Sequence, residues 1–221
     1  MKKWLISGMI FVSILFYGVS GYSQERILQI YKNIVKMAEK TTPSSYTVEI
    51  ENKKFKEALE ELPEDILTGK GAPAVKIQFA KGVGVKIIIE NIKSEYETLF
   101  SMYEEYFKFS GISKVQNPVE FKQIIDNNKA DFYKENEEFV IVQAWDPGKK
   151  ERDDNYALFS LDKKMWVIKK AVFYLDGTPF VQAENSYKSY GKYYLPYKIE
   201  LKYLDKNEAD IFLFKDYHFG K

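Results

Sequence analysis

Histidine and cysteine, which serve in many proteins as nucleophiles, general bases or metal ligands, are scarce in this chain. It has one histidine, His218, and no cysteine. A serine–histidine pair needs an oriented imidazole, and a zinc site needs several histidine or cysteine ligands. His218 stands between Tyr217 and Phe219 in a segment that predicts a strand, without a sequence signal for an orienting partner. We therefore expect a structural or surface role for His218 and a protein that is not an enzyme and holds no cofactor or metal; a hydrolase is the least favoured hypothesis.

Two short motifs could bind ions, but both have a simpler interpretation. Glu151, Asp153 and Asp154 could offer carboxylate oxygens to Ca²⁺. The spacing and the glycine of an EF-hand are missing, so a solvated loop is favoured. The segment KGVGVK, residues 81–86, contains two glycines as a phosphate loop does. It lies between two predicted strands and no helix follows it, so we expect a turn.

Tyrosine and phenylalanine are abundant, with 17 and 16 copies, and they favour strands and lined cavities. A cluster of five tyrosines near the C-terminus could stack on sugars or line a ligand groove. Its members are Tyr187, Tyr190, Tyr193, Tyr194 and Tyr197. Tyrosine is also an ordinary strand residue, and this second interpretation is favoured.

The main binding hypothesis rests on apolar residues that recur along predicted strands and would share one face of a sheet. The cavity-lining candidates are Val75, Ile77, Phe79, Ile87, Ile89, Ile141, Phe159, Phe173, Leu201 and Tyr203. Such a face either is filled by helix side chains or leaves room for a ligand, and each buried acyl methylene contributes about 0.8 kcal/mol. The inward set is assigned from the period alone, and a slip of one residue would turn every side chain outward.

The first half of the chain predicts helices alternating with strands. We expect helices over residues 24–40, 55–67, 95–109 and 117–125, a strand over residues 46–50, and a hairpin of strands over residues 74–79 and 83–90. From Ala130 onward, short segments rich in β-branched and aromatic residues alternate with turns, which is typical of an antiparallel meander. The expected strands cover residues 131–134, 139–145, 156–161, 167–175, 180–190, 193–203 and 209–219.

The strand over residues 193–203 has one dry and one wet face. Leu195, Tyr197 and Ile199 alternate there with polar residues. A long one-sided meander preceded by amphipathic helices predicts a curved sheet that wraps its apolar face around those helices. No repeat or linker divides the chain, so residues 24–221 are expected to form a single domain.

The N-terminus predicts a secretory signal peptide over residues 1–23. Lys2 and Lys3 precede an apolar run, and small residues follow it up to Ser23, where we expect cleavage. An uncleaved anchor is the alternative, but the run is shorter than the roughly 20 residues of a spanning helix. Cleavage would leave 31 basic against 32 acidic residues, a balance that argues against nucleic acid as a partner. Without cysteine, the mature chain cannot be acylated as a bacterial lipoprotein is.

The order of strands and turns near the C-terminus resembles that of the LolA/LolB-like superfamily of lipoprotein carriers. The resemblance lies in the run Leu158–Gly177, which ends in Asp-Gly, in the strand Phe180–Ser186, and in the segment SYGKYYLPYKIEL, Ser189–Leu201. It implies an unclosed antiparallel β-barrel with helices at its mouth, an apolar cavity, and transfer of acylated cargo across the periplasm. The fold of this superfamily is more informative about architecture than about cargo.

Two features depart from the superfamily pattern. LolA-type carriers use an arginine near the cavity to hold the lid closed, and neither Arg26 nor Arg152 aligns with it. The predicted helix over residues 55–67 also has no counterpart in the pattern.

The sequence thus predicts an α+β protein, an unclosed antiparallel β-barrel with amphipathic helices on its concave face. The expected function is that of a monomeric periplasmic carrier or chaperone. It would bind acyl chains of lipids or lipoproteins and exchange them with membrane-bound donor and acceptor proteins. The alternative is an envelope sensor or scaffold that binds a protein partner through the same fold.

Overall fold

The computed structural model describes residues 23–81, 83–95, 121–122, 125–127, 129–146, 148–206 and 208–220. The predicted signal peptide lies outside this part except for Ser23, and so does nearly all of the helix expected over residues 95–109. Within the described ranges, none of the helices has the length and apolar character needed to cross a membrane.

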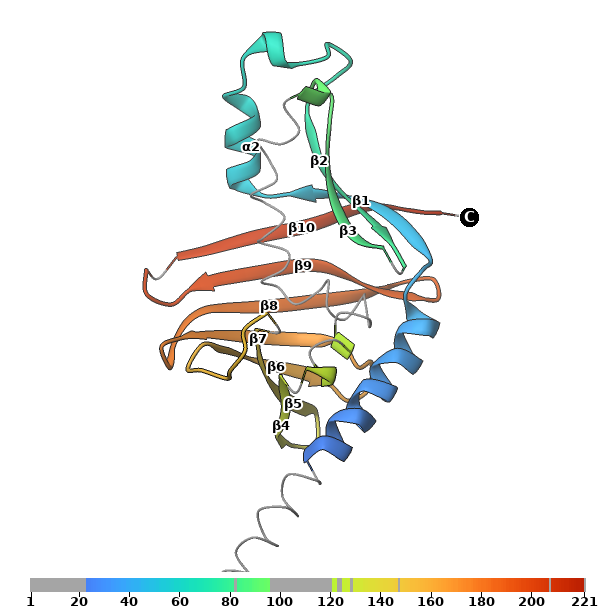
Figure 1. Ribbon diagram of the computed structural model, residues 1–221. Helices are drawn as coiled ribbons and strands as arrows, with labels where there is room; N and C mark the ends of the chain where they lie inside the picture. The colour runs from blue at the N-terminus through green and yellow to red at the C-terminus, as the bar shows by residue number, and fades with distance from the viewer. Residues whose placement is uncertain are drawn as a thin grey trace, which may run out of the picture.

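A ten-stranded antiparallel sheet dominates the described part of the chain (Figure 1). The strands are β1 (Ser45–Glu51), β2 (Ala74–Ala80), β3 (Gly84–Glu90), β4 (Ala130–Glu135), β5 (Phe139–Trp145), β6 (Tyr156–Asp162), β7 (Ile168–Leu175), β8 (Thr178–Tyr190), β9 (Tyr193–Tyr203) and β10 (Glu208–Phe219). Their order is β3-β2-β1-β10-β9-β8-β7-β6-β5-β4. Strands β3 and β4 end this order without pairing with each other, so the predicted unclosed antiparallel barrel is confirmed.

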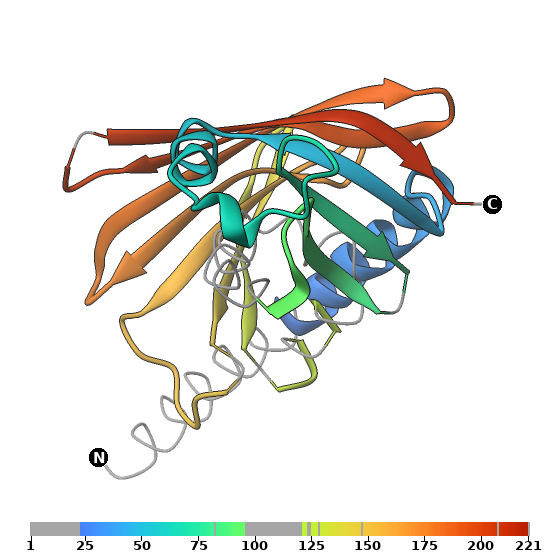
Figure 2. The same cartoon turned by 90° about the horizontal axis from the view of Figure 1, so that it is seen from above.

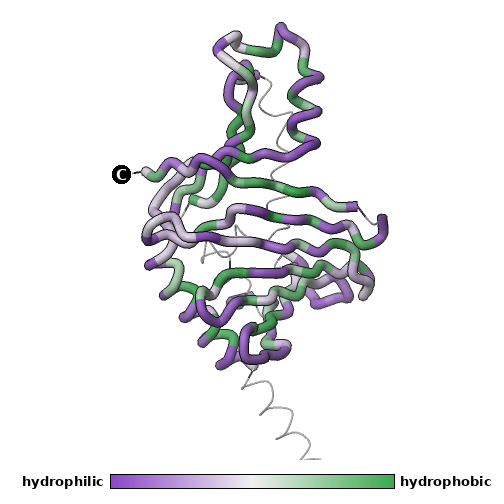
Figure 3. Tube along the Cα trace, turned by 180° about the vertical axis from the view of Figure 1, so that it is seen from behind, coloured by the Kyte–Doolittle hydropathy of each residue, from purple (hydrophilic) through white to green (hydrophobic). Residues whose placement is uncertain are grey.

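Hydrophobic and hydrophilic residues alternate along the strands (Figure 3), and because successive side chains point to opposite faces, the two faces of the sheet differ in polarity. One row of paired residues that crosses the sheet is almost entirely apolar. It runs Val142, Phe159, Ala171, Ala183, Leu201. The next row faces the other way and is polar: Ser160, Lys170, Glu184, Glu200. The apolar row is buried and the polar row is half-exposed, so the first lies on the concave face and the second on the convex face.

A long helix over residues 23–41 lies inside the curve of the sheet (Figure 2). Its buried side chains are spaced at helical intervals, with Ile27 2%, Ile30 0% and Ile34 1% exposed. The Thr41 hydroxyl donates a hydrogen bond to the Met37 carbonyl oxygen, 2.9 Å away, and the helix ends there. The predicted amphipathic helix over residues 24–40 is therefore confirmed.

Helix α2 (Lys53–Glu60) is shorter than the predicted helix over residues 55–67. Pro63 cannot continue a helix, and the chain resumes as a single 3₁₀ turn, η1 (Glu64–Ile66). The Asn52 side chain caps α2 by accepting a hydrogen bond from the Phe55 backbone N–H at 3.1 Å, and it donates to the Ile211 carbonyl oxygen at 2.9 Å. α2 is thereby fixed to β10 near the start of that strand.

Strand β9 departs from regular alternation in one place. The pairing register between β9 and β8 shifts between Ser186 and Tyr187 of β8. Ser186 pairs with Lys198, whereas Tyr187 pairs with Pro196. Pro196 is therefore buried and Tyr197 is exposed, so the prediction that Tyr197 shares the dry face with Leu195 and Ile199 is wrong. An extra residue on one strand of a pair disrupts the ladder locally, and beyond it Leu195 is again buried, as Ile199 and Leu201 are.

Candidate functional site

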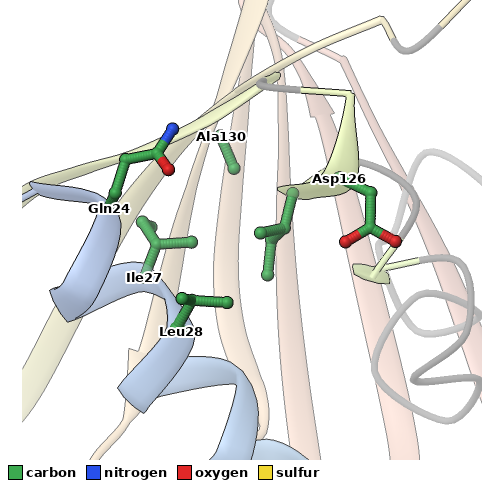
Figure 4. A pocket seen from close by; sticks show the side chains of 6 residues that line it. Gln24, Ile27, Leu28, Asp126 and Ala130 are labelled. Atoms are coloured by element: carbon green, nitrogen blue, oxygen red, sulfur yellow. The ribbon is translucent and has the colours of Figure 1, made fainter.

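A pocket of about 200 Å³ lies between the start of the long helix and the edge of the sheet at β4 (Figure 4). The long helix contributes three of its lining residues, the helical stretch at residues 125–126 contributes two, and β4 contributes one. They are Gln24, Ile27, Leu28, Ile125, Asp126 and Ala130. The pocket thus joins the concave face to the open edge of the barrel.

The lining of the pocket is apolar inside and polar at its margin. Ile27 is 2% exposed and Ala130 is 6% exposed, so both form the floor. Leu28, by contrast, is 47% exposed although it is a large apolar side chain. Gln24 and Asp126 supply the polar groups (Figure 4). The lining as a whole exposes somewhat more polar than apolar surface, so the hollow has an apolar floor under a polar margin.

The long helix is held to β4 beside the pocket by an ion pair. The Arg26 guanidinium lies 2.7 Å from the Glu135 carboxylate, which also lies 2.8 Å from the Lys163 ammonium. Hydrogen bonds from Lys163 and then from Arg26 hold the pKa of Glu135 below its ordinary value. The Arg26 side chain also lies over the Phe132 ring, with Cζ 5.9 Å from the ring centroid. Arg26 therefore positions the first described turn of the helix against the sheet edge.

A second polar contact joins α2 to β10, away from the pocket. Asp210 is 6% exposed on β10, and its carboxylate accepts hydrogen bonds from the Lys54 ammonium at 2.8 Å and the Tyr203 hydroxyl at 3.2 Å. Next to it, the Phe55 and Phe212 rings pack edge to face with centroids 5.6 Å apart. This contact fixes α2 on the sheet and is a structural one.

Seven of the ten predicted cavity residues are buried in the core. They are Val75, Ile77, Phe79, Ile87, Ile89, Phe159 and Leu201. None of them lines the pocket described above. They form the apolar inner surface of the sheet, and side chains of the protein cover them.

Phe173 and Tyr203 lie on the concave face but are only partly buried. Both pair with Val181, an inward-facing residue of β8. The Phe173 ring packs edge to face on Phe159, with centroids 6.1 Å apart. Their predicted inward orientation agrees with the pairing.

The prediction for Ile141 was wrong in orientation. Ile141 pairs with Ser160, which belongs to the polar row of the convex face, while its neighbours Val140 and Val142 are fully buried. Segment 139–145 is apolar at nearly every position, so its period could not indicate which residues face inward.

The pocket residues were missed because the prediction was made from strands alone. Ile27 was assigned to the buried face of the helix, which is correct, but not to a binding site. Leu28 is the useful signal, because it is an apolar residue beside the regular stripe of Ile27, Ile30 and Ile34. An apolar residue that widens such a stripe indicates a second contact surface on the helix.

The other candidate residues do not form reactive groupings in the described part of the chain. His218 is exposed on β10 and pairs across the strands with Thr47. Asp153 is bound by Lys149 at 2.6 Å and by the Asn155 side chain at 3.1 Å, which lowers its pKa. No group of three potential metal ligands occurs among the described residues. The KGVGVK segment joins β2 to β3, as predicted.

No protein-family profile matches the chain, and no curated protein matches it in sequence. Solved structures do share its fold. A candidate outer membrane lipoprotein-sorting protein domain from Vibrio parahaemolyticus superposes with a TM-score of 0.54 over 91% of this chain and 93% of that one, at 13% identity.

Two further solved structures are similar over comparable lengths. A LolA superfamily protein from Nitrosomonas europaea has a TM-score of 0.49 and 10% identity, over 90% of this chain and 94% of that one. A DUF1329 family protein from Desulfovibrio piger has a TM-score of 0.46 and 9% identity, over 87% and 92%. The similarity to the Vibrio domain gives the fold of this chain. This fold is the LolA-like one that the sequence of the C-terminal strands predicts.

Proposed function

We propose that this protein is a carrier that binds acyl chains of lipids or lipoproteins on the concave side of its sheet. The pocket between the long helix and β4 is the observation that carries the proposal. Its floor is apolar, it opens at the unpaired edge of the barrel, and its outer wall includes the exposed Leu28. The name of the Vibrio domain supports the proposal by analogy, because the two chains share a fold.

The size of the pocket sets the expected size of its occupant. A water molecule takes about 30 Å³ of liquid volume, and a methylene group is of similar size. A pocket of about 200 Å³ therefore holds about seven methylenes. At about 0.8 kcal/mol for each fully buried methylene, they would contribute at most about 5 to 6 kcal/mol before the cost of association is subtracted. The pocket thus suits one end of an acyl chain, with the rest lying along the partly exposed concave residues.

Phe173 and Tyr203 are the predicted cavity residues best placed to meet the rest of such a chain. Both face inward and both retain solvent exposure, unlike Phe159 and Leu201. We include them in the proposed binding surface together with the pocket, and we leave the seven buried residues to the core.

The proposed setting is the bacterial periplasm. The N-terminal segment carries the features of a signal peptide, and cleavage near Ser23 would release a single domain at the start of the long helix. A carrier there would receive cargo from one membrane-bound protein and deliver it to another towards the outer membrane. It would need neither a cofactor nor catalytic groups.

The test is a lipid analysis of protein isolated without denaturation from the soluble extract of producing cells. We expect extractable lipid by mass spectrometry and saturable binding of a fluorescent fatty acid that unlabelled fatty acid displaces. Absence of lipid together with absence of probe binding would contradict the carrier function.

A second candidate function is an envelope sensor or scaffold that binds a protein partner. The observation that favours it is the filling of the concave face, where Phe79, Val140 and Ile30 are all 0% exposed. Recovery of one stoichiometric protein partner with no bound lipid would support this function over the first.

A further inference from the structure

The hairpin that joins β8 to β9 ends in a cluster of aromatic rings and lysines. We call it the hairpin tip, and it consists of Lys188, Tyr190, Lys192, Tyr193 and Tyr197, with Phe219 of β10 beside them. Tyr190 and Tyr193 form the last pair of the hairpin, and Gly191 takes a φ of 62° in the turn. Figure 1 shows this turn next to the end of β10, at the same side of the sheet as the C-terminus.

Two rings of the hairpin tip contact rings at the end of β10. The Tyr193 and Phe219 centroids lie 4.9 Å apart, and those of Tyr190 and Tyr217 lie 4.6 Å apart. Tyr197 and Phe219 are each 39% exposed, so these rings are not enclosed by the core. The Tyr217 hydroxyl donates to the Pro196 carbonyl oxygen at 2.6 Å, which fixes the base of the cluster. The tip therefore presents a preformed aromatic surface.

Lysine side chains flank these rings. The Lys188 ammonium lies 4.9 Å from the Tyr190 centroid and 5.8 Å from that of Tyr197, and the Lys192 ammonium lies 5.2 Å from the Tyr193 centroid. Both lysines are exposed. Long cationic side chains beside amphipathic rings are typical of residues that lie at the boundary between water and lipid.

Charge is distributed unequally between the two ends of the sheet. Residues 187–197 include two lysines and no acidic residue, and Asp216 is the nearest acid along β10. The turns at the opposite end are mixed in charge, with Asp176 between β7 and β8 and both Asp205 and Lys206 between β9 and β10. A negatively charged surface would thus attract the hairpin tip more than the opposite end.

We propose that the hairpin tip docks the protein on the surface of a membrane that contains anionic lipids. The tyrosine and phenylalanine rings would lie at headgroup level, and Lys188 and Lys192 would contact the lipid phosphates. A neutral sugar is the other partner that an aromatic surface suits, but lysines without acidic neighbours favour an anionic partner. None of the tip residues belongs to the pocket or to the predicted cavity set, so this surface is independent of the acyl-binding proposal.

The test is co-sedimentation of the exported protein with vesicles of phosphatidylcholine containing about 30% phosphatidylglycerol, and with vesicles of phosphatidylcholine alone. We expect binding to the anionic vesicles that weakens in high salt, and little binding to the neutral ones. Each lysine at such a surface is expected to contribute about fivefold in affinity. The variant K188Q/K192Q should therefore bind about 25-fold more weakly, and K188R/K192R should bind as the native protein does.

The matched control is K53Q/K56Q, which removes two exposed lysines from α2 at the other end of the sheet. It should bind vesicles as the native protein does. Equal binding by K188Q/K192Q, an equal loss in the α2 control, or binding to a soluble anionic polysaccharide but not to vesicles would overturn the proposal. Fatty-acid binding by K188Q/K192Q is expected to stay native, and this readout separates a failure of docking from a failure of the carrier function.

Discussion

Filling the pocket from its floor should weaken acyl binding by a predictable amount. Ala130 is 6% exposed and directs its side chain into the pocket from β4 (Figure 4). The substitution Ala130→Leu adds three carbon atoms, which would displace about three methylenes of a bound chain. At about 0.8 kcal/mol each, the loss is about 2.4 kcal/mol, or about 50-fold in affinity.

The assay is titration of each variant with a fluorescent fatty acid. Ala209→Leu is the matched control, because it makes the same chemical change at an exposed position of β10 outside the pocket. Overpacking can destabilise a protein by about 1 to 3 kcal/mol, so thermal unfolding must show that Ala130→Leu is folded at the assay temperature. A folded Ala130→Leu variant with native affinity would refute the assignment of this pocket as the acyl site.

Three further predictions concern stability. Phe159→Ala should reduce the free energy of unfolding, measured by urea denaturation, by about 3 to 5 kcal/mol. Ile141→Ala, on the convex face, should reduce it by about 1 kcal/mol. Equal losses would show that the two faces are misassigned. Glu135→Gln should destabilise the protein by no more than about 1 kcal/mol at neutral pH, since the ion pairs are partly exposed. The pKa of Glu135 is lowered in the folded protein, so the stability difference between the native protein and Glu135→Gln should be present at neutral pH and vanish as the pH falls through that pKa. A difference that persists at pH 2 would contradict the assignment of these ion pairs to Glu135. Asn52→Ala removes the cap of α2 and should cost about 1 kcal/mol in urea denaturation, and an unchanged midpoint would show that the cap is dispensable.

The strands were predictable because each is rich in β-branched or aromatic residues and is bounded by turn signals. The hairpin of β2 and β3 and the seven C-terminal strands follow from such local signals. Pairing between β1 and β10 is different, because it joins residues 46 and 219. The sequence contains no local signal that predicts this pairing.

The pocket was not predictable from the same signals. Apolar alternation identifies the residues that face inward, but the best of them, such as Phe79 and Phe159, fill the core. Space for a ligand arises instead where the long helix and β4 diverge, and this geometry depends on the placement of two segments about 100 residues apart. The continuous apolar run of β5 also has no usable period, which explains the error at Ile141.

The long helix is held unequally along its length, and this determines where the barrel opens most easily. At the pocket end the helix is held by one buried side chain, Ile27, and by the Arg26–Glu135 ion pair, which is partly exposed and contributes at most about 1 kcal/mol. Further along, Ile30 and Ile34 are buried, and each contributes about 1.5 to 3 kcal/mol. Lifting the first turn therefore costs less than lifting the middle of the helix. An acyl chain entering beside Leu28 could widen the pocket at this end while the sheet and the rest of the helix remain packed.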